Sequence, residues 1–121
     1  MRALVEKRVG EVVAGIAQVT GAKITLTYKR GYPVTRNHGA QTAFATRIAR
    51  EVAGDTNVHE MPPLMGGEDF SYMLEARPGA FIFCGNGDSA GLHHPAYDFN
   101  DEAIVYGTSY WIRLVENTLA A

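Results

Sequence analysis

The sequence has little of what three broad classes of protein require. Its 121 residues contain one cysteine, Cys84, which excludes an intramolecular disulfide and fits a reducing, cytoplasmic setting. No apolar run approaches the roughly 18 residues of a membrane-spanning helix, and the charged amino-terminal stretch lacks the apolar centre of a signal peptide. Basic residues are not in excess, because the formal net charge is -2 and the pI is near 6.0. We therefore expect neither a membrane protein nor a general nucleic-acid binder.

What is present is enough apolar material for a packed core. Hydrophobic residues make up 46% of the chain, and the length is that of a single domain. The chain has no internal repeat and no low-complexity tract. It opens directly into a helical pattern without a capping residue or a preceding strand, so we expect it to be a piece of a longer protein.

Helical periodicity recurs four times along the chain. The first helix is predicted up to Thr20, with Gly21 ending it, and the second covers about residues 38–53, with Asn37 as its cap and Gly54 after it. A third follows the Gly66–Gly67 turn and ends before residues 77–79, and Asn100 caps the last. The apolar residues expected to face inward are Val5, Val9, Val12, Ile16 and Val19 in the first helix, Phe44, Ile48 and Val52 in the second, Phe70, Met73 and Leu74 in the third, and Ile104, Gly107, Trp111, Leu114 and Thr118 in the last.

Strand patterns separate these helices. Residues 22–29 alternate apolar and polar side chains, residues 58–61 form a short candidate, and the apolar run 80–84 suits a strand covered on both faces. We therefore predict an α/β fold with helices packed on a sheet. A polar connection at residues 34–39 is interpreted as the boundary between two structural units. The helix and strand before it form a small α+β layer, and the alternation after residue 37 indicates half of an α/β sheet.

Two clusters contain the side chains of greatest chemical interest. The first is Gly66-Gly67-Glu68-Asp69, in which the carboxylates can bind a metal, act as a base or hold an amine. They can equally be the acidic first turn of a helix, but that alternative does not explain two consecutive glycines. The second cluster is the pair His93 and His94, followed by a proline. It is either a source of one metal ligand or a structural pair, and adjacent extended residues face opposite sides, so at most one faces a given site.

Three motifs occur together and in order: MGGEDFSYML, FIFCGNG and LHHPAYDFNDEAIVYG, with GYPVTRNH upstream. Together they resemble the carboxyl-terminal end of M20-family metallopeptidases, in the amidohydrolase branch that contains hippurate hydrolases and N-acyl-amino-acid amidohydrolases. The resemblance covers essentially the whole chain. It implies a partial zinc-peptidase-like catalytic domain at residues 37–121, preceded by the end of a lid or dimerisation domain at residues 1–36.

The resemblance also assigns roles to individual residues. His93 aligns with a metal-ligating histidine, although His94 stands where the family has serine or threonine, which leaves His94 as the alternative ligand. Gly66, Gly67 and Glu68 match a loop that lines the metal and substrate pocket, and Asn37 matches a lid-junction asparagine that reaches substrate. No catalytic residue is expected in this chain, because the general-base glutamate and the other metal ligands belong to the amino-terminal part of the family's catalytic domain.

These resemblances imply a metal-dependent amidohydrolase of the cytoplasm that cleaves the amide bond of N-acyl amino acids or small peptides. Zinc, manganese or cobalt is expected in the full-length enzyme, and none tightly bound to these 121 residues alone, which should be inactive. The expected partners are the small substrate, the amino-terminal half of the same protein and a second copy contacted through the lid domain. The alternative is a non-catalytic binding or oligomerisation module, in which residues 22–30 pair with a partner.

Overall fold

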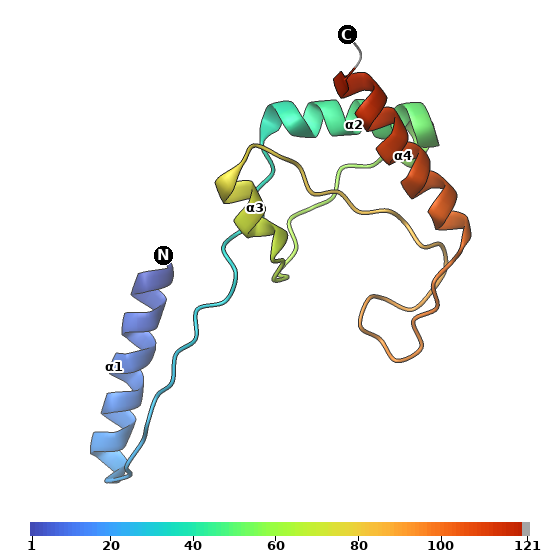
Figure 1. The fold of residues 1–121 in the computed structure, drawn as a ribbon. Coiled ribbons are helices and arrows are strands. Elements are labelled where there is room, and N and C mark those ends of the chain that lie inside the picture. Colours follow the sequence, from blue (N-terminus) through green and yellow to red (C-terminus); the bar gives the residue numbers. More distant parts are fainter. Residues whose placement is uncertain (120–121) are drawn as a thin grey trace. The chain divides into compact units, whose positions relative to one another are not determined.

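The computed structural model describes residues 1–119, which fall into two compact units, one of residues 1–31 and one that begins at residue 32. The first unit contains α1 (Arg2–Thr20), and the second contains α2 (Gly39–Ala53), the 3-10 turn η1 (Asp55–Asn57), α3 (Phe70–Ala76) and α4 (Glu102–Leu119) (Figure 1). In the described part of the chain, no helix has both the length and the apolar character needed to cross a membrane.

The predicted α/β class is wrong, because residues 1–119 contain helices and no strand. Residues 22–29, 58–61 and 80–84 are all without regular structure. An alternating or apolar sequence describes a side-chain pattern that suits a pleated surface, whereas a strand also needs a neighbour to accept and donate its backbone hydrogen bonds. Val58 keeps an extended backbone (φ -113°, ψ 112°), but the described residues supply no neighbouring strand for it.

In the first unit, α1 and the segment that follows it are held together at their far ends. Gly21 ends the helix in the left-handed conformation (φ 69°), as predicted. The Arg2 guanidinium donates to the Gly31 carbonyl over 2.6 Å, and Arg30 Nε donates to the Glu6 carboxylate over 2.8 Å. The segment therefore runs back along α1.

The predicted inner face of α1 differs from the observed one. Of the predicted stripe only Val9 is half-buried, whereas Val5, Val12, Ile16 and Val19 are exposed. The half-buried positions are Glu6, Val9, Gly10, Val13 and Ala17. The observed face is selected by the segment that the ion pair at Glu6 fastens to the helix.

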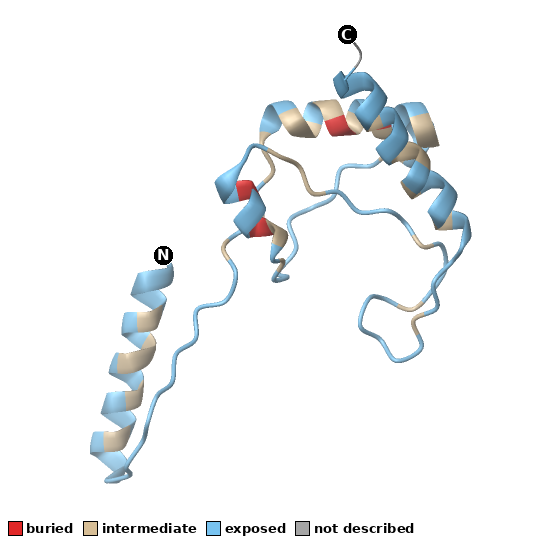
Figure 2. Ribbon diagram, viewed as in Figure 1, coloured by how far each residue is buried: buried red, intermediate tan, exposed pale blue. Residues whose placement is uncertain are grey.

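In the second unit, α2 packs against α4. The Ile48 side chain is fully buried and Ala45 nearly so, in agreement with the predicted face of α2, and Figure 2 shows the buried positions confined to α2 and α3. On α4 the half-buried residues are Ala103, Gly107, Ser109, Tyr110 and Leu114. Burial raises the pKa of the Tyr110 phenol above its ordinary value.

The predicted face of α4 is therefore correct at Gly107 and Leu114 and wrong at Ile104 and Trp111, which are 52% and 64% exposed. The helix is apolar around much of its circumference, so periodicity alone cannot select the side that meets α2. Asn100 does cap α4, because its Oδ1 accepts from the Glu102 amide over 3.0 Å.

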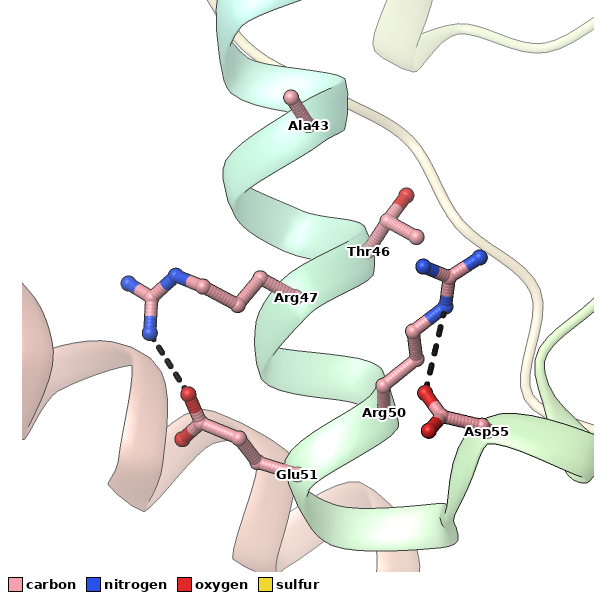
Figure 3. Close-up of a pocket in the computed structure, with 6 residues that line it drawn as sticks. All are labelled: Ala43, Thr46, Arg47, Arg50, Glu51 and Asp55. Carbon is pink, nitrogen blue, oxygen red and sulfur yellow. Dashed lines mark hydrogen bonds and ion pairs between the residues drawn. The ribbon is translucent and has the colours of Figure 1, made fainter.

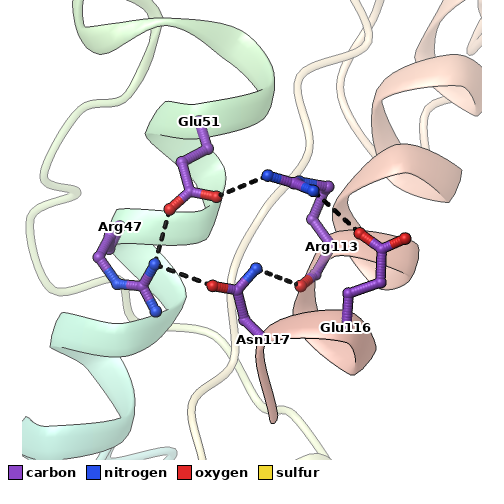
Figure 4. Close-up of polar contacts among 5 residues, drawn as sticks. All are labelled: Arg47, Glu51, Arg113, Glu116 and Asn117. Carbon is purple, nitrogen blue, oxygen red and sulfur yellow. Dashed lines mark hydrogen bonds and ion pairs between the residues drawn. The ribbon is translucent and has the colours of Figure 1, made fainter. Parts of the chain in front are cut away.

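Polar side chains fix the register of α2 against α4 (Figure 4). Arg47 Nη1 donates to Glu51 Oε1 over 2.6 Å and to Asn117 Oδ1 over 3.2 Å. Arg113 lies 3.6 Å from the other Glu51 oxygen, and 2.9 Å from Glu116. Since these side chains are about half exposed, water screens their attraction, and they contribute more to register than to stability.

Candidate functional site

The two glycines of the Gly66-Gly67-Glu68 loop have different surroundings. A Cβ added to Gly67 would lie 3.2 Å from Cδ2 of Tyr32, whose ring packs edge-on against Tyr72. A Cβ added to Gly66 would meet no atom within 4 Å. Packing against Tyr32 therefore explains the glycine at position 67, while the surroundings of Gly66 leave its backbone open to approach from outside.

Glu68 stands immediately before α3 and holds the start of that helix. Its Oε1 accepts from the Phe70 amide over 3.0 Å, and its carbonyl accepts from the Ser71 hydroxyl over 2.6 Å. The Thr35 hydroxyl reaches the same carbonyl at 3.5 Å. These contacts agree with the alternative interpretation of Glu68 as a carboxylate at the start of a helix. The second carboxylate oxygen, Oε2, is left for other partners. Asp69 makes no side-chain cap hydrogen bond.

Asn37 pairs with the backbone of Phe81, 44 residues further along the chain. Its Nδ2 donates to the Phe81 carbonyl over 2.8 Å, and its Oδ1 accepts from the Phe81 amide over 2.7 Å. The predicted cap role is wrong, since the residue before α2 is His38, which makes no side-chain cap hydrogen bond. The His38 amide donates to the Gly79 carbonyl over 3.0 Å, and the Gly79 amide donates to His38 Nδ1 over 3.2 Å.

This arrangement, the Asn37–His38 clamp, places Asn37 near the glutamate loop. Phe81 packs on Phe70 with ring centroids 5.5 Å apart, and Phe70 begins α3 directly after Glu68 and Asp69. Of the predicted pocket residues, Glu68 is thus connected to Asn37 through Phe70 and Phe81. Asn37 retains one N–H and one carbonyl lone pair after pairing with Phe81.

The two histidines occupy distinct positions in an exposed turn. His94 organises the turn, because its amide donates to Gly91, its carbonyl accepts from Tyr97, and its Nδ1 accepts from the Ala96 amide over 3.1 Å. His93 has a left-handed backbone (φ 65°), the one non-glycine residue in the described chain with a positive φ. No hydrogen bond to the His93 ring occurs within residues 1–119. The local structure therefore engages one nitrogen of His94 and leaves both nitrogens of His93 accessible.

The described residues bring no complete metal site together. Within residues 1–119, no group of three or more His, Cys, Asp or Glu side chains is placed to hold a metal ion. Nor does any hydrogen bond or ion pair within that range connect His93 to the region of Glu68 and Asn37. His93 suits a metal as a single imidazole ligand, and the other ligands are not supplied by the described chain.

Asn86 is a site-loop residue that sequence reasoning missed. Its Nδ2 donates to the Asp98 carbonyl over 2.6 Å and to Ser89 Oγ over 2.8 Å, and its Oδ1 accepts from the Asn100 amide over 2.8 Å. The loop that these contacts close, residues 86–100, contains both histidines. The only sequence signal is an asparagine between two glycines, which predicts a turn and not its partners.

A separate surface pocket lies beside α2 and contains no predicted site residue (Figure 3). Its charges are already paired, Arg47 with Glu51 at 2.6 Å and Arg50 with Asp55 at 3.8 Å. The pocket is lined by Ala43, Thr46, Arg47, Arg50, Glu51 and Asp55. It therefore offers no unpaired charge that would recognise a charged ligand.

The profile of Peptidase family M20/M25/M40 matches residues 3–117, so the chain belongs to this family and the resemblance seen in its motifs is confirmed. YhaA of Bacillus subtilis (strain 168) is 36% identical over 110 residues, which are 87% of this chain and 28% of that protein. The hippurate hydrolase of Campylobacter jejuni is 32% identical over 114 residues, 93% of this chain and 30% of that protein.

A plant relative, IAA-amino acid hydrolase ILR1-like 4 of Arabidopsis thaliana, is 34% identical over 113 residues, 86% of this chain and 26% of that protein. The chain thus spans less than a third of the length of these relatives. No solved structure matches the chain. By their names, these relatives are a putative amidohydrolase and two hydrolases.

Proposed function

We propose that this chain supplies the carboxyl-terminal part of a cytoplasmic, metal-dependent amidohydrolase that cleaves the amide bond of N-acyl amino acids or small peptides. The observation that carries the proposal is the family match over residues 3–117, together with the names of the relatives. One is a hippurate hydrolase, and hippurate is an N-acyl amino acid. Others are an N-acetyldiaminopimelate deacetylase and an N-acetylcysteine deacetylase.

His93 is the residue proposed to hold the metal, which would be zinc, manganese or cobalt. A bound divalent metal polarises an amide carbonyl and lowers the pKa of bound water. The support for His93 over His94 is local, since His94 Nδ1 already accepts from Ala96 whereas the His93 ring has no hydrogen-bond partner in residues 1–119. The left-handed backbone of His93 is uncommon for a residue other than glycine, although histidine adopts it more readily than most.

Gly66, Gly67, Glu68 and Asn37 are proposed to line the substrate pocket. The open backbone at Gly66 suits close approach of a planar amide, and the Glu68 oxygen not engaged by Phe70 can accept a hydrogen bond from substrate. Asn37 has one N–H and one lone pair left for a carboxylate or amide. The Glu68 and Asn37 side chains are each held by hydrogen bonds of their own, which would fix their directions before substrate binds.

The amino-terminal part of the same protein is proposed to cover the apolar surface that the described chain leaves exposed. Ile104, Trp111 and Val115 lie on one face of α4 and are half to two-thirds exposed. We assign residues 1–36 to the end of a lid domain, through which two copies can pair, and residues 37–121 to the second half of the catalytic domain. The general base is proposed to come from the amino-terminal part.

The test is hydrolysis by the longest natural protein that contains these 121 residues, loaded separately with zinc, manganese or cobalt. Amine release is measured on a panel of N-acyl amino acids, including hippurate, and dipeptides. We expect metal-dependent cleavage that His93→Ala reduces by at least about 100-fold and His94→Ala reduces less, since a lost ligand weakens metal binding directly. The absence of cleavage for every substrate and metal would refute the function, and the opposite order of the two variants would refute the ligand assignment.

A second candidate function is a non-catalytic oligomerisation module, favoured by one observation. Ile24, Leu26 and Tyr28 project from a segment without regular structure and are each about two-fifths exposed. Light scattering over a range of concentrations tests this candidate, because a module of this kind must form oligomers in the chain alone. Dimers would also follow from pairing through the lid domain, so the deciding outcome is a monomer. A strict monomer that stays folded would exclude it.

A further inference from the structure

The loop that presents the two histidines is closed by one side chain. Asn86 bonds to both ends of the segment, to Ser89 Oγ over 2.8 Å on one side and to the Asp98 carbonyl over 2.6 Å and the Asn100 amide over 2.8 Å on the other. The amide of one residue therefore replaces the strand ladder or disulfide that would otherwise join the ends of such a loop.

This closure is anchored to a regular element. Asn100 donates its amide N–H to Asn86, and its side-chain Oδ1 accepts from the Glu102 amide over 3.0 Å, so that it caps α4. The Ala103 amide adds a bond to the Asn100 carbonyl over 3.0 Å. Through Asn100 the base of the loop is attached to the first turn of α4, an 18-residue helix that packs on α2.

Close packing at the base supports the same conclusion. Gly87 has a left-handed backbone (φ 78°), and a Cβ added there would lie 3.4 Å from Nδ2 of Asn100. Within the loop, the bonds of His94 to Gly91, Ala96 and Tyr97 form a second fixed point. His93 lies inside this turn, with its own backbone in the left-handed region.

We propose that Asn86 is a positioning residue that closes the 86–100 loop on α4 and thereby sets the backbone conformation and direction of His93. The inference rests on the proposed function only in taking His93 as the metal ligand. Asn86 is proposed to touch neither metal nor substrate. It acts through Asn100 and the turn of His94.

The experiment uses nuclear magnetic resonance on the 121-residue chain and its Asn86→Ala variant. Amide hydrogen exchange at Asn100 and Tyr97 reports closure of the loop, and the backbone chemical shifts of His93 report its left-handed conformation. Each hydrogen bond is expected to slow exchange by about 2- to 13-fold. Asn86→Ala should therefore raise the exchange rate of the Asn100 amide by about that factor, and the His93 chemical shifts should no longer be those of a left-handed backbone. Unchanged exchange and unchanged His93 shifts would overturn the proposal.

Added Mn²⁺ then separates this inference from the proposed function. In the natural chain Mn²⁺ should broaden the ring signals of His93 more than those of His94. In the Asn86→Ala variant the broadening of the two rings should be closer to equal. If Mn²⁺ broadens both rings equally in the natural chain, the assignment of His93 as the ligand fails. Amide exchange and the His93 backbone shifts then still decide whether Asn86 is a positioning residue. If the preference survives Asn86→Ala together with unchanged shifts, the positioning role fails and the ligand assignment stands.

Two matched variants control for general loss of stability. Asn57→Ala removes one amide-to-backbone bond, to Ala53 over 2.8 Å, outside the loop. Ser89→Ala removes one of the three Asn86 contacts without separating the loop ends. Both should leave the shifts of His93 and the ratio of ring broadening as in the natural chain, and a loss equal to that of Asn86→Ala in either variant would contradict the proposal.

Discussion

Replacing Asn37 by alanine should lower the free energy of unfolding of the second unit. The substitution removes two bonds at once, of 2.8 Å and 2.7 Å, between the Asn37 amide and the backbone of Phe81. Each such bond contributes about 1 kcal/mol net, so the pair should contribute about 2 kcal/mol. Phe81 is half-buried, so water replaces its lost partners only in part.

The loss should be visible both globally and at one amide. Urea unfolding followed by circular dichroism measures the free energy of unfolding, and amide exchange at Phe81 measures local opening. Asn37→Asp is the sharper variant, because it keeps the acceptor for the Phe81 amide but places an anionic oxygen against the Phe81 carbonyl. We expect Asp to be no more stable than Ala at neutral pH.

Asn57→Ala again serves as the matched control, since Asn57 contributes one exposed bond, over 2.8 Å to Ala53. Its cost should stay below about 0.5 kcal/mol, the usual range for an exposed site. If Asn37→Ala costs no more than this control and leaves the exchange of the Phe81 amide unchanged, the clamp does not hold residues 79–81 and the reasoning is refuted.

Three further predictions concern other parts of the chain. Gly67→Ala should lower stability by at most about 1 kcal/mol, because the half-exposed Tyr32 ring must shift slightly to admit the new Cβ, and Tyr32→Ala added to it should recover part of the loss; additive effects in urea unfolding would argue against the contact. Since burial raises the pKa of Tyr110, the folded state holds that proton more tightly, so the stability it contributes is present below the ordinary tyrosine pKa and is lost as pH rises through the raised one. Tyr110→Phe should abolish this alkaline loss in unfolding experiments. The 121-residue chain alone should be inactive toward N-acyl amino acids with zinc, manganese or cobalt, because a catalytic site needs about three protein ligands; turnover abolished by His93→Ala would show the reverse.

The parts of the fold that could be predicted are those specified within a few residues. Helical spacing located α2, and the single glycines Gly21 and Gly54 marked where α1 and α2 end. The cap of α4 by Asn100 is equally local. These features could be predicted because the residues that interact are close together in the sequence.

What could not be predicted depends on partners distant in sequence. The strands at residues 22–29 and 80–84 needed neighbours that the described chain lacks, and the Phe81 backbone pairs instead with a side chain 44 residues earlier. The inner face of α4 was ambiguous because both sides are apolar. The role of Asn86 was not predicted, because its partners lie up to 14 residues away and no local sequence spacing indicates them.

The two parts of the proposed site are held by separate sets of contacts, and this leads to a last prediction. Tyr32, Thr35 and α3 hold the Gly67–Glu68 loop, whereas Asn86, Asn100 and α4 hold the histidine loop. No hydrogen bond or ion pair within residues 1–119 joins the two sets.

Substitutions in the two sets should therefore act independently in the chain alone. The unfolding free energies of Gly67→Ala and Asn86→Ala should add to within about 0.5 kcal/mol in the double variant, as they do for sites that share no partner. In the longer protein both loops are proposed to face one substrate, so the same pair should be non-additive in kcat/KM. A coupling above about 1 kcal/mol in the chain alone would mean that the two loops already contact each other, and the separate-support argument would be wrong.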